Sequence, residues 1–447
     1  MKKNIYNHPR MVVVSLVLLF SANILNAQFV STLAGSTTSG SADGTGTAAS
    51  FYYPTGVVAD GSGNLFVADM LNNEIRKVVI STGVVTTLAG STISGSSDGT
   101  GTAASFNWPY GVAIDGNGNL YVADQRNNEI RKIVLSTGAV TTLAGSTTAG
   151  SVDGTGTAAS FNWPSGVAID SNGNLYVADQ RNNEIRKIVI STGVVTTLAG
   201  STSAGSANGT GTAASFSYPT GITTDGNGNL YIADQHNNEI RNVVISTGVV
   251  TTLAGSTTAG SANGTGTAAS FTYPTGVAID SNGNIYIADQ SNTEIRKIVI
   301  STGVVTTLAG STTSGSANGT GTSASFYYPT GVAMDGNGNL FVADAGNDEI
   351  RQIAISPTGV TEIQTYSSMS VYPNPTTQML NVKFSEPLLS EATLKIEDVT
   401  GREISLVKIR QASGDLQVDV TSLSAGIYFV SVTNAEENIM SEKFIKQ

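Results

Sequence analysis

Short apolar runs alternate with clusters of glycine, asparagine and serine along most of the chain. Between Gly111 and Gly145 the runs read GVAID, NLYVAD, EIRKIVL and AVTTLAG, with turn residues between them. They are rich in valine, isoleucine, tyrosine and threonine, and each is too short for an amphipathic helix. The pattern therefore predicts four β-strands that form one small antiparallel sheet.

This unit recurs six times at an interval of 55 residues. The repeat is clearest at one phenylalanine per unit: Phe51, Phe106, Phe161, Phe216, Phe271 and Phe326. A sheet of this size cannot bury both of its faces alone, so neighbouring units must cover one another. Radial stacking keeps the sheet edges short and predicts an all-β fold, a six-bladed β-propeller with four-stranded blades.

The two ends of the array predict how the ring closes. The segment FVSTLAGST, residues 29–37, copies the fourth-strand run VVTTLAGST of residues 84–92, whereas the sixth unit ends in the divergent GVTEIQTYS. We therefore expect the N-terminal strand to complete the last blade beside residues 350–355, which removes two open edges. The propeller is expected to span residues 28–364.

The first 27 residues have the order of a secretory signal peptide. Lys2, Lys3 and Arg10 lead into an apolar stretch, and Ala27 is the expected cleavage position. An uncleaved membrane anchor is the alternative, although the stretch is short for a spanning helix and no other segment is long enough. Cleavage moves the formal net charge from −11 to −14, which disfavours nucleic acid and anionic lipid as partners.

Near residue 365 the repeat stops and the composition changes. Residues 365–370 are expected to be a linker, and the alternating runs of residues 371–447 predict a small Ig-like β-sandwich. The motifs of this tail resemble the C-terminal sorting domain of the type IX (Por) secretion system of Bacteroidetes. The resemblance is carried above all by Tyr372, Pro373, Asn374, Pro375, Gly401, Arg402, Gly426, Tyr428 and Lys443.

The resemblance implies export, handling by the type IX secretion machinery, and a final location outside the cell or on its surface. An adhesive or structural Ig-like domain is the alternative for the tail. The repeat itself, PxGVAxDxxGNLYVADxxNNEIRK, resembles the NHL repeat. That family implies a propeller that serves mostly as a binding platform, with a few enzymatic relatives.

The residues available for catalysis favour the binding platform. A histidine zinc site of the lyase type is not expected, because His236 is the only histidine beyond the predicted signal peptide and reads as an exposed loop residue. A lactonase-type calcium site needs carboxylates in the central channel, where only Thr223 and Thr224 interrupt apolar and glycine positions. The chain has no cysteine, which removes thiolate metal sites and thiol nucleophiles. Together these observations lead us to expect no catalytic residue, metal or cofactor.

Two sets of repeated aspartates are predicted to be structural. Asp115 and its equivalents precede a Gly-Asn turn, whose amides such carboxylates usually bind, and the sequence lacks the bidentate glutamate of a calcium loop. Asp124 and its equivalents end the second strand and are expected to close the next loop. Glu129 and Arg131 lie two positions apart on one strand face and are expected to pair in every blade.

Candidate binding residues lie on the face that carries the inter-blade connections and the turns between second and third strands. The long Ser/Thr/Gly/Ala-rich connections are expected there, as are the turn positions at which the copies differ. An aromatic residue precedes each blade's proline and is suited to stack on a sugar or a peptide. The candidates are Tyr53, Trp108, Trp163, Tyr218, Tyr273, Tyr328, Gln125, Arg126, Gln180, Arg181, Gln235 and His236.

Sequence drift and blade packing would also produce this pattern of residues. Exposed turn residues vary when nothing constrains them, and the aromatic residues can serve to pack neighbouring blades. The sequence favours a secreted or surface-bound, non-catalytic scaffold that presents a multivalent loop face to a glycan or a protein. It leaves open an extracellular lyase or lactonase-like enzyme, and a matrix component that associates with itself.

Overall fold

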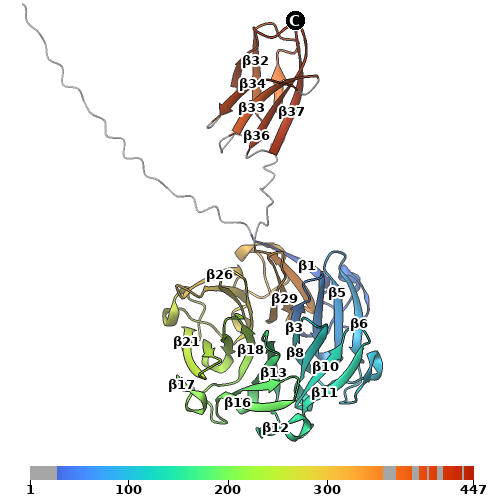
Figure 1. The fold of residues 1–447 in the computed structure, drawn as a ribbon, viewed down its shortest axis with the longest axis vertical. Coiled ribbons are helices and arrows are strands. Elements are labelled where there is room, and N and C mark those ends of the chain that lie inside the picture. The colour runs from blue at the N-terminus through green and yellow to red at the C-terminus, as the bar shows by residue number, and fades with distance from the viewer. Residues whose placement is uncertain (1–27, 356–368, 385–391, 400–401, 410–415, 435–436) are drawn as a thin grey trace, which may run out of the picture. The chain divides into compact units, whose positions relative to one another are not determined.

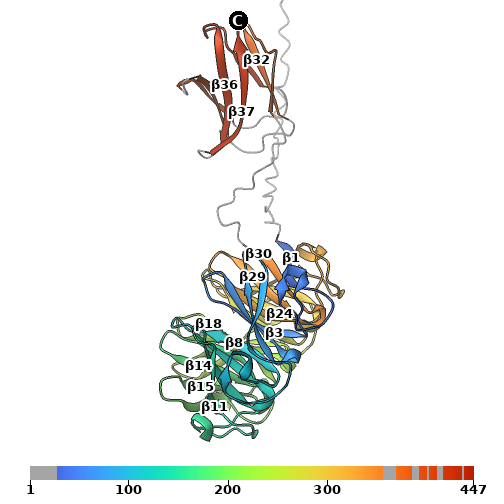
Figure 2. The same ribbon diagram turned by 90° about the vertical axis from the view of Figure 1, so that its right-hand side faces the viewer.

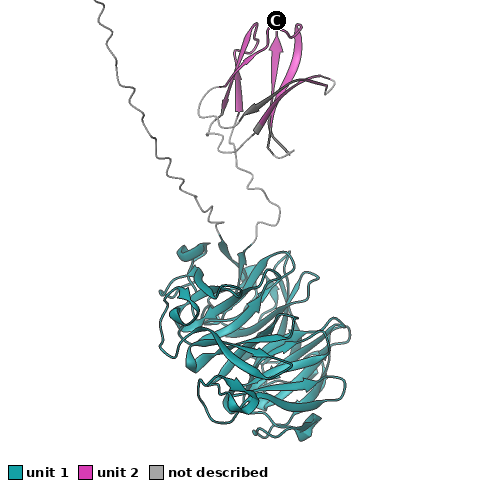
Figure 3. Cartoon of the chain, turned by 60° about the vertical axis from the view of Figure 1, so that its left-hand side comes forward, with its two compact units in different colours: residues 1–356 teal, residues 357–447 magenta. Residues whose placement is uncertain are grey.

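The computed structural model describes residues 28–355, 369–384, 392–399, 402–409, 416–434 and 437–447 (Figure 1). The chain divides into two compact units between Ser356 and Pro357 (Figure 3). The predicted signal peptide, residues 1–27, lies outside the described residues. The second unit's first strand, β31 (Met369–Tyr372), begins inside the range 365–370 that we expected to be a linker.

Six sheets with one common strand order surround the centre of the first unit, so the predicted six-bladed propeller is confirmed (Figures 1 and 2). The innermost strands of blades one to six are β3 (Pro54–Ala59), β8 (Pro109–Ile114), β13 (Pro164–Ile169), β18 (Pro219–Thr224), β23 (Pro274–Ile279) and β28 (Pro329–Met334). The second strands are β4 (Asn64–Asp69), β9 (Asn119–Asp124), β14 (Asn174–Asp179), β19 (Asn229–Asp234), β24 (Asn284–Asp289) and β29 (Asn339–Asp344).

The outer half of each blade is equally regular. The third strands are β5 (Glu74–Val79), β10 (Glu129–Val134), β15 (Glu184–Val189), β20 (Glu239–Val244), β25 (Glu294–Val299) and β30 (Glu349–Ala354). The fourth strands are β6 (Val84–Gly90), β11 (Ala139–Gly145), β16 (Val194–Gly200), β21 (Val249–Gly255), β26 (Val304–Gly310) and, in blade six, the N-terminal β1 (Phe29–Gly35).

The N-terminal strand closes the ring in the register used by every other blade. Ser31 lies opposite Gln352 and Gly35 opposite Glu349, with a register shift between Thr32 and Ala34. The fourth strand of blade two shows the same shift against β10. The predicted closure of the last blade by the N-terminal strand is therefore confirmed.

A fifth strand of two residues, which was not predicted, lines the outer edge of every blade. These strands are β2 (Gly44–Thr45), β7 (Gly99–Thr100), β12 (Gly154–Thr155), β17 (Gly209–Thr210), β22 (Gly264–Thr265) and β27 (Gly319–Thr320). Each is followed by one 3-10 turn: η1 (Gly46–Ala48), η3 (Gly101–Ala103), η5 (Gly156–Ala158), η7 (Gly211–Ala213), η9 (Gly266–Ala268) and η11 (Gly321–Ser323). A Gly-Thr pair carries no alternating apolar pattern, so hydrophobic periodicity could not reveal it.

The long inter-blade connections do not lie on the predicted face alone, which corrects our expectation. Each runs down the outer edge of the following blade and back. In blade two, Thr100 pairs with β11 and the Gly101 N–H donates to the Gly138 carbonyl, at 2.9 Å, in the turn at the far end of the sheet. The connection then returns to Phe106, whose carbonyl accepts a hydrogen bond from Gly95.

One buried arginine per blade holds this connection in place. Arg131 on β10 is 0% exposed and donates to the carbonyls of Ser97 and Ser105, at 3.1 and 3.0 Å, and to Asp98, at 2.8 Å. It also pairs with Asp124 at 3.0 Å. Its guanidinium carbon lies 5.3 Å from the Phe106 ring centroid, so the repeated phenylalanine and the arginine are one structural unit.

The predicted pairing of Glu129 with Arg131 is present but loose, since their nearest charged atoms are 3.9 Å apart. The aspartates supply the closer contacts. Asp98 has equivalents at Asp43 and Asp153, whereas the later blades carry an asparagine, as at Asn208, which accepts the same hydrogen bond from Arg241 at 2.9 Å.

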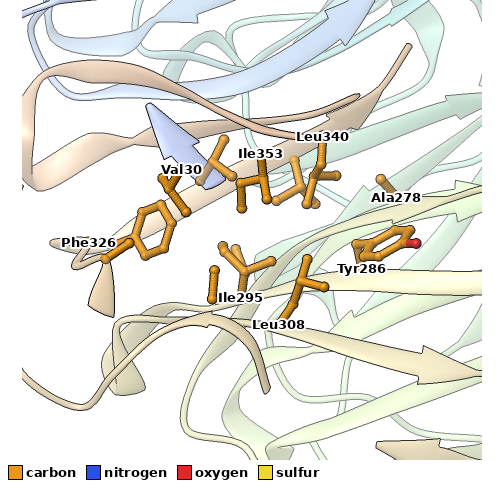
Figure 4. Packing of buried hydrophobic residues seen from close by; sticks show 13 residues of the cluster. Val30, Ala278, Tyr286, Ile295, Leu308, Phe326, Leu340 and Ile353 are labelled. Carbon is orange, nitrogen blue, oxygen red and sulfur yellow. The ribbon is translucent and has the colours of Figure 1, made fainter. Parts of the chain in front are cut away.

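The hydrophobic cores lie between blades. In the cluster of Figure 4, Ala278, Tyr286, Ile295 and Leu308 of blade five pack against blade six and the closing strand. The residues from that side are Val30, Phe326, Val332, Leu340, Val342 and Ile353. Because each sheet buries its faces only against its neighbours, a complete hydrophobic core exists only in the assembled ring and not in a single blade.

The innermost strands approach most closely at one glycine each. These are Gly56, Gly111, Gly166, Gly221, Gly276 and Gly331. A Cβ on Gly166 would lie 2.2 Å from the Thr220 carbonyl oxygen, and one on Gly331 would lie 2.1 Å from that of Thr55, which closes the circle. Only glycine fits where two backbones approach this closely.

The second unit is a small sandwich of two sheets. β31, β32 (Met379–Phe384) and β35 (Leu416–Asp419) form one sheet. β33 (Ala392–Asp398), β34 (Glu403–Ile409), β36 (Gly426–Asn434) and β37 (Glu437–Lys446) form the other. Leu380 and Val418 from the first sheet and Ile396, Val430 and Phe444 from the second share one buried core, as an Ig-like sandwich requires.

Candidate binding face

The end of the propeller at which the second strands finish carries six tips, and we call it the loop face. The tips are the 3-10 turns η2 (Met70–Asn72), η4 (Gln125–Asn127), η6 (Gln180–Asn182), η8 (Gln235–Asn237), η10 (Gln290–Asn292) and η12 (Ala345–Asn347). Asp124 fixes the tip of blade two, because it accepts hydrogen bonds from the Asn127 side chain and the Asn107 N–H, both at 2.8 Å. The predicted role of these aspartates in closing the loop is confirmed.

The six predicted aromatic residues share this face in one backbone conformation. Each has a φ of 50–56°, in the left-handed region that bulky side chains rarely adopt. The Trp108 N–H donates to Asn73 of the preceding blade at 3.0 Å, and the Trp163 N–H donates to Asn128 at 3.0 Å. The N–H groups of Tyr53, Tyr218 and Tyr273 make the same kind of contact, so five of the six blade joints are linked beside the aromatic residue.

Blades two and three place two arginines on two tryptophans. The Arg126 guanidinium carbon lies 3.3 Å from the Trp108 ring centroid and 5.9 Å from that of Trp163, and Arg181 lies 3.4 Å above Trp163. The two indole rings are 6.1 Å apart at 71°. We call these four residues the arginine sector, in which cation–π contacts hold both exposed guanidiniums on rigid rings.

Blades four and five replace this arrangement with a histidine. His236 is exposed, as predicted, and stacks on Tyr218 with ring centroids 4.1 Å apart and planes at 13°. Its other contact is edge-on to Tyr273 at 5.3 Å. The stacked tyrosine shields part of the imidazole from water, and this partial desolvation lowers the pKa of His236, because it disfavours the imidazolium.

Tyrosines dominate the joint between blades six and one. Tyr327 and Tyr328 lie 4.7 Å apart and are each 40% exposed, and Tyr52 is 44% exposed. Burial raises the pKa of the Tyr53 phenol, with smaller contributions from Tyr328, Tyr327 and Asp348. We call Tyr52, Tyr53, Tyr327 and Tyr328 the tyrosine sector, of which only Tyr53 and Tyr328 were predicted as candidates.

The glutamines among the candidates differ from the arginines beside them. Gln125 and Gln180 are buried, 3% and 8% exposed, and Gln235 is half-buried. The exposed positions at these tips are Arg126, Arg181 and His236. The structure thus brings the candidate residues to one face but turns two of the glutamines inward.

The central channel is narrow and lined by backbone, apolar side chains and hydroxyls. A cavity of about 80 Å³ is bounded by the glycine ring, Tyr110 and threonines, and one of about 230 Å³ is bounded by Val57, Ile114, Thr223 and Thr224 among others. Burial raises the pKa of the Tyr110 phenol, which keeps it protonated. Among the described residues, no group of three or more histidine, aspartate or glutamate side chains could hold a metal.

The turn aspartates at the opposite end bind their own turns, as predicted. Asp115 accepts hydrogen bonds from the N–H groups of Asn117 and Asn119, at 2.9 and 2.8 Å, and from the Tyr121 hydroxyl, at 3.0 Å. Although burial acts in the other direction, these hydrogen bonds lower the pKa of Asp115.

The motif residues of the second unit tie its two ends together. In the segment that begins at Tyr372, the peptide bonds Tyr372–Pro373 and Asn374–Pro375 are both cis. The Asn374 side chain donates to the Lys443 carbonyl and accepts from the Ile445 N–H, both at 2.9 Å. The motif at the start of the tail therefore anchors the last strand.

The remaining motif residues are local. Arg402 pairs with Asp398 at 3.0 Å, and Tyr428 donates to the Ser424 carbonyl at 3.0 Å and stacks on Phe444. Gly426 opens β36, and Gly401 lies outside the described residues. No helix in the described part of the chain is long and apolar enough to cross a membrane.

Comparison with known families agrees with both units. Residues 370–447 match the secretion system C-terminal sorting domain of the Por type. The NHL repeat matches residues 106–133, 161–188, 216–241, 271–298 and 326–353, that is, the last five of the six copies.

Similar proteins share the repeat over part of their length. Protein SUPPRESSOR OF QUENCHING 1, chloroplastic, of Arabidopsis thaliana is 32% identical over 382 residues, which cover 82% of this chain and 35% of that protein. NHL repeat-containing protein 2 of Gallus gallus is 29% identical over 338 residues, covering 67% and 46% respectively. The chain thus spans less than half of either relative.

Two solved structures from Bacteroides thetaiotaomicron share the fold. A protein of unknown function superposes with a TM-score of 0.58 at 24% identity, covering 74% of this chain and 76% of that one. A putative phosphatase gives a TM-score of 0.54 at 15% identity, covering 74% and 79%. At these identities the likeness shows the fold alone.

Fold and tail together define an exported β-propeller protein. The chain is an NHL-repeat protein with a C-terminal Por secretion system sorting domain. That domain indicates handling by the type IX machinery and secretion to the cell surface or beyond it.

Proposed function

We propose that the loop face binds a glycan or a protein outside the cell and that the propeller performs no catalysis. The observation that carries the proposal is the exposure of aromatic rings on one face. Tyr273 is 44% exposed, and Tyr327 and Tyr328 are each 40% exposed, while the exposed arginines stacked on Trp108 and Trp163 keep their donors in solvent. Flat rings of this kind lose little conformational entropy on binding.

The face supports a more specific proposal than six equivalent sites. Guanidiniums already cover one side of Trp108 and Trp163, whereas the tyrosine rings of blades five, six and one have no such cover. Stacking on sugar rings is therefore assigned to the tyrosines. Because the tips differ in chemistry from blade to blade, one extended ligand that crosses several blades suits the face better than six copies of a small ligand.

The proposal is tested on a glycan and peptide array probed with the chain from Gln28 to Gln447. The double variant Y327A/Y328A removes the most exposed ring pair and is expected to weaken binding by about tenfold, on the scale of aromatic contacts. The matched control is I93A, because Ile93 is 76% exposed on an inter-blade connection and is not one of the candidate residues. Binding that is the same in all three proteins would refute the proposal.

A further inference from the structure

The only arginines on the propeller tips are concentrated in two adjacent blades, together with the only two tryptophans of the chain. The position of Arg126 and Arg181 is occupied by Leu71, His236, Ser291 and Gly346 in the other blades. The position of Trp108 and Trp163 is a tyrosine in the other four blades. The two changes occur in the same blades, and they form one contiguous structure, the arginine sector, rather than scattered substitutions.

Both guanidiniums are held in place but not neutralised. Among the described residues, neither side chain has a hydrogen-bond or ion-pair partner, in contrast to the six buried arginines of the third strands. Their backbones are fixed, since the N–H groups of Arg126 and Arg181 donate to Asn107 and Asn162 at 3.0 and 3.1 Å. A guanidinium stacked on an indole keeps its edge N–H donors available for a bidentate acceptor.

The carboxylates nearest in the sequence to these tips face inward. The side chains of Asp124 and Asp179 are 0% exposed, and those of Glu129 and Glu184 are 9% and 8% exposed. The solvent-facing charge of the two tips themselves is therefore positive, in a chain whose formal net charge is −11. The half-exposed carboxylates of Asp98 and Asp153, on the connections of the same blades, are paired with the buried Arg131 and Arg186. Because the protein as a whole is acidic, it does not attract anions in general. An anionic group is therefore expected to bind only where it contacts this local cationic strip.

We propose that the arginine sector binds the carboxylate groups of an acidic polysaccharide, such as one built from uronic acids. This inference rests on the proposed glycan binding of the same face and adds its chemical class. Planar guanidiniums match planar carboxylates through paired N–H donors, and the tyrosine rings further round the face stack on the apolar faces of sugar rings along the same polymer. A polymer rather than a monosaccharide is required, because the two chemistries occupy different blades.

The test uses the chain from Gln28 to Gln447 and two probes that share a backbone, polygalacturonate and its methyl ester. Titration calorimetry should show binding to polygalacturonate that weakens by about tenfold or more on esterification and with rising salt, as expected for a charge-assisted contact. The variant R126Q/R181Q should lose about tenfold in affinity for polygalacturonate and nothing for the ester. R126K/R181K keeps the positive charge but not the planar pair of N–H donors, so it should recover only part of the affinity that R126Q/R181Q loses.

The matched control is K132Q/K187Q, which removes two positive charges from strands of the same two blades and should bind like the parent. Equal affinity of parent and R126Q/R181Q for polygalacturonate, or no binding of polygalacturonate at all, would overturn the inference. If the parent binds only neutral glycans and Y327A/Y328A abolishes that binding, the inference fails while the proposed glycan function stands. Equal binding of poly-L-glutamate would overturn the polysaccharide assignment in favour of an acidic peptide.

Discussion

Asp348 accepts a hydrogen bond of 2.6 Å from the backbone N–H of Tyr53, although 295 positions separate the two residues in the chain. The contact joins blade six to blade one. Four of the five other joints use an asparagine at the same place, as Asn128 does for Trp163, and the joint of blades five and six has Thr293 instead. The closing joint of the ring is thus built like the internal ones, with a carboxylate in place of an amide.

This equivalence predicts the behaviour of two variants at the closing joint. D348N retains the acceptor and should unfold in urea at the parent's midpoint, whereas D348A leaves the Tyr53 N–H without its partner and should cost about 1 kcal/mol. N128A at an internal joint is the control and should cost a similar amount. Equal destabilisation by D348N and D348A would show that the hydrogen bond is not what stabilises the joint.

The glycine ring around the axis predicts a steric effect. In G166A the new Cβ would lie 2.2 Å from the Thr220 carbonyl oxygen, so blades three and four must separate, and we expect a loss of about 1–3 kcal/mol. The control is G116A on the turn of blade two, where a Cβ meets nothing within 4 Å and φ is not positive. Thermal unfolding should separate the two variants, and equal melting temperatures would argue against close contact of the innermost strands.

The third-strand glutamates predict an unusual pH dependence. Burial raises the pKa of Glu74, Glu184 and Glu349 to about 7, and the Oε2 atom of each has no hydrogen-bond partner among the described residues. A carboxyl group whose folded-state pKa is raised favours the folded protein below its unfolded pKa, and this contribution is lost as the pH rises through the folded value. The melting temperature should therefore rise as the pH falls from about 8 to about 5.

The triple variant E74Q/E184Q/E349Q isolates this effect. Since it carries neutral groups of the same shape, its melting temperature should change less over that range than the parent's. The buried aspartates, such as Asp69 and Asp124, whose pKa burial raises to about 6 and about 7, are present in both proteins and contribute equally to both. The turn aspartates act in the opposite direction, because hydrogen bonds lower the pKa of Asp115, and their contribution is lost only at lower pH. A parent protein that becomes steadily more stable from about pH 5 to about pH 8 would contradict the prediction.

The architecture could be predicted because the apolar runs that form its strands repeat along the sequence. The 55-residue interval indicated the blades, and the likeness of residues 29–37 to the fourth-strand runs indicated the closure. The path of the connections along the outer edge of each blade could not be predicted in this way, because a Gly-Thr pair has no hydrophobic pattern. The hydrogen-bond partners of Arg131, such as Asp98, come close to it only in the folded blade. A 55-residue spacing of Asp43, Asp98 and Asp153 was the one available signal.

The binding face was predicted as a set of positions but not as an arrangement. Gln125 and Arg126 are neighbours in a turn, yet one is buried and the other stacks on Trp108, and only the conformation of the turn decides between them. Tyr52 and Tyr327 were missed because they precede the aromatic position that repeats in every blade. Their exposure depends on packing at the closing joint, which a single repeat does not encode.

Closure of the ring by the N-terminal strand is most directly tested by a crosslink, since the chain contains no cysteine of its own. Ser31 lies opposite Gln352 in blade six, and Thr306 lies opposite Lys297 in the same way within blade five. Residues paired across antiparallel strands are close enough for a disulfide. On oxidation, S31C/Q352C should form an intramolecular disulfide as completely as K297C/T306C, measured by peptide mass spectrometry. Efficient crosslinking of K297C/T306C with none in S31C/Q352C would contradict the closed ring.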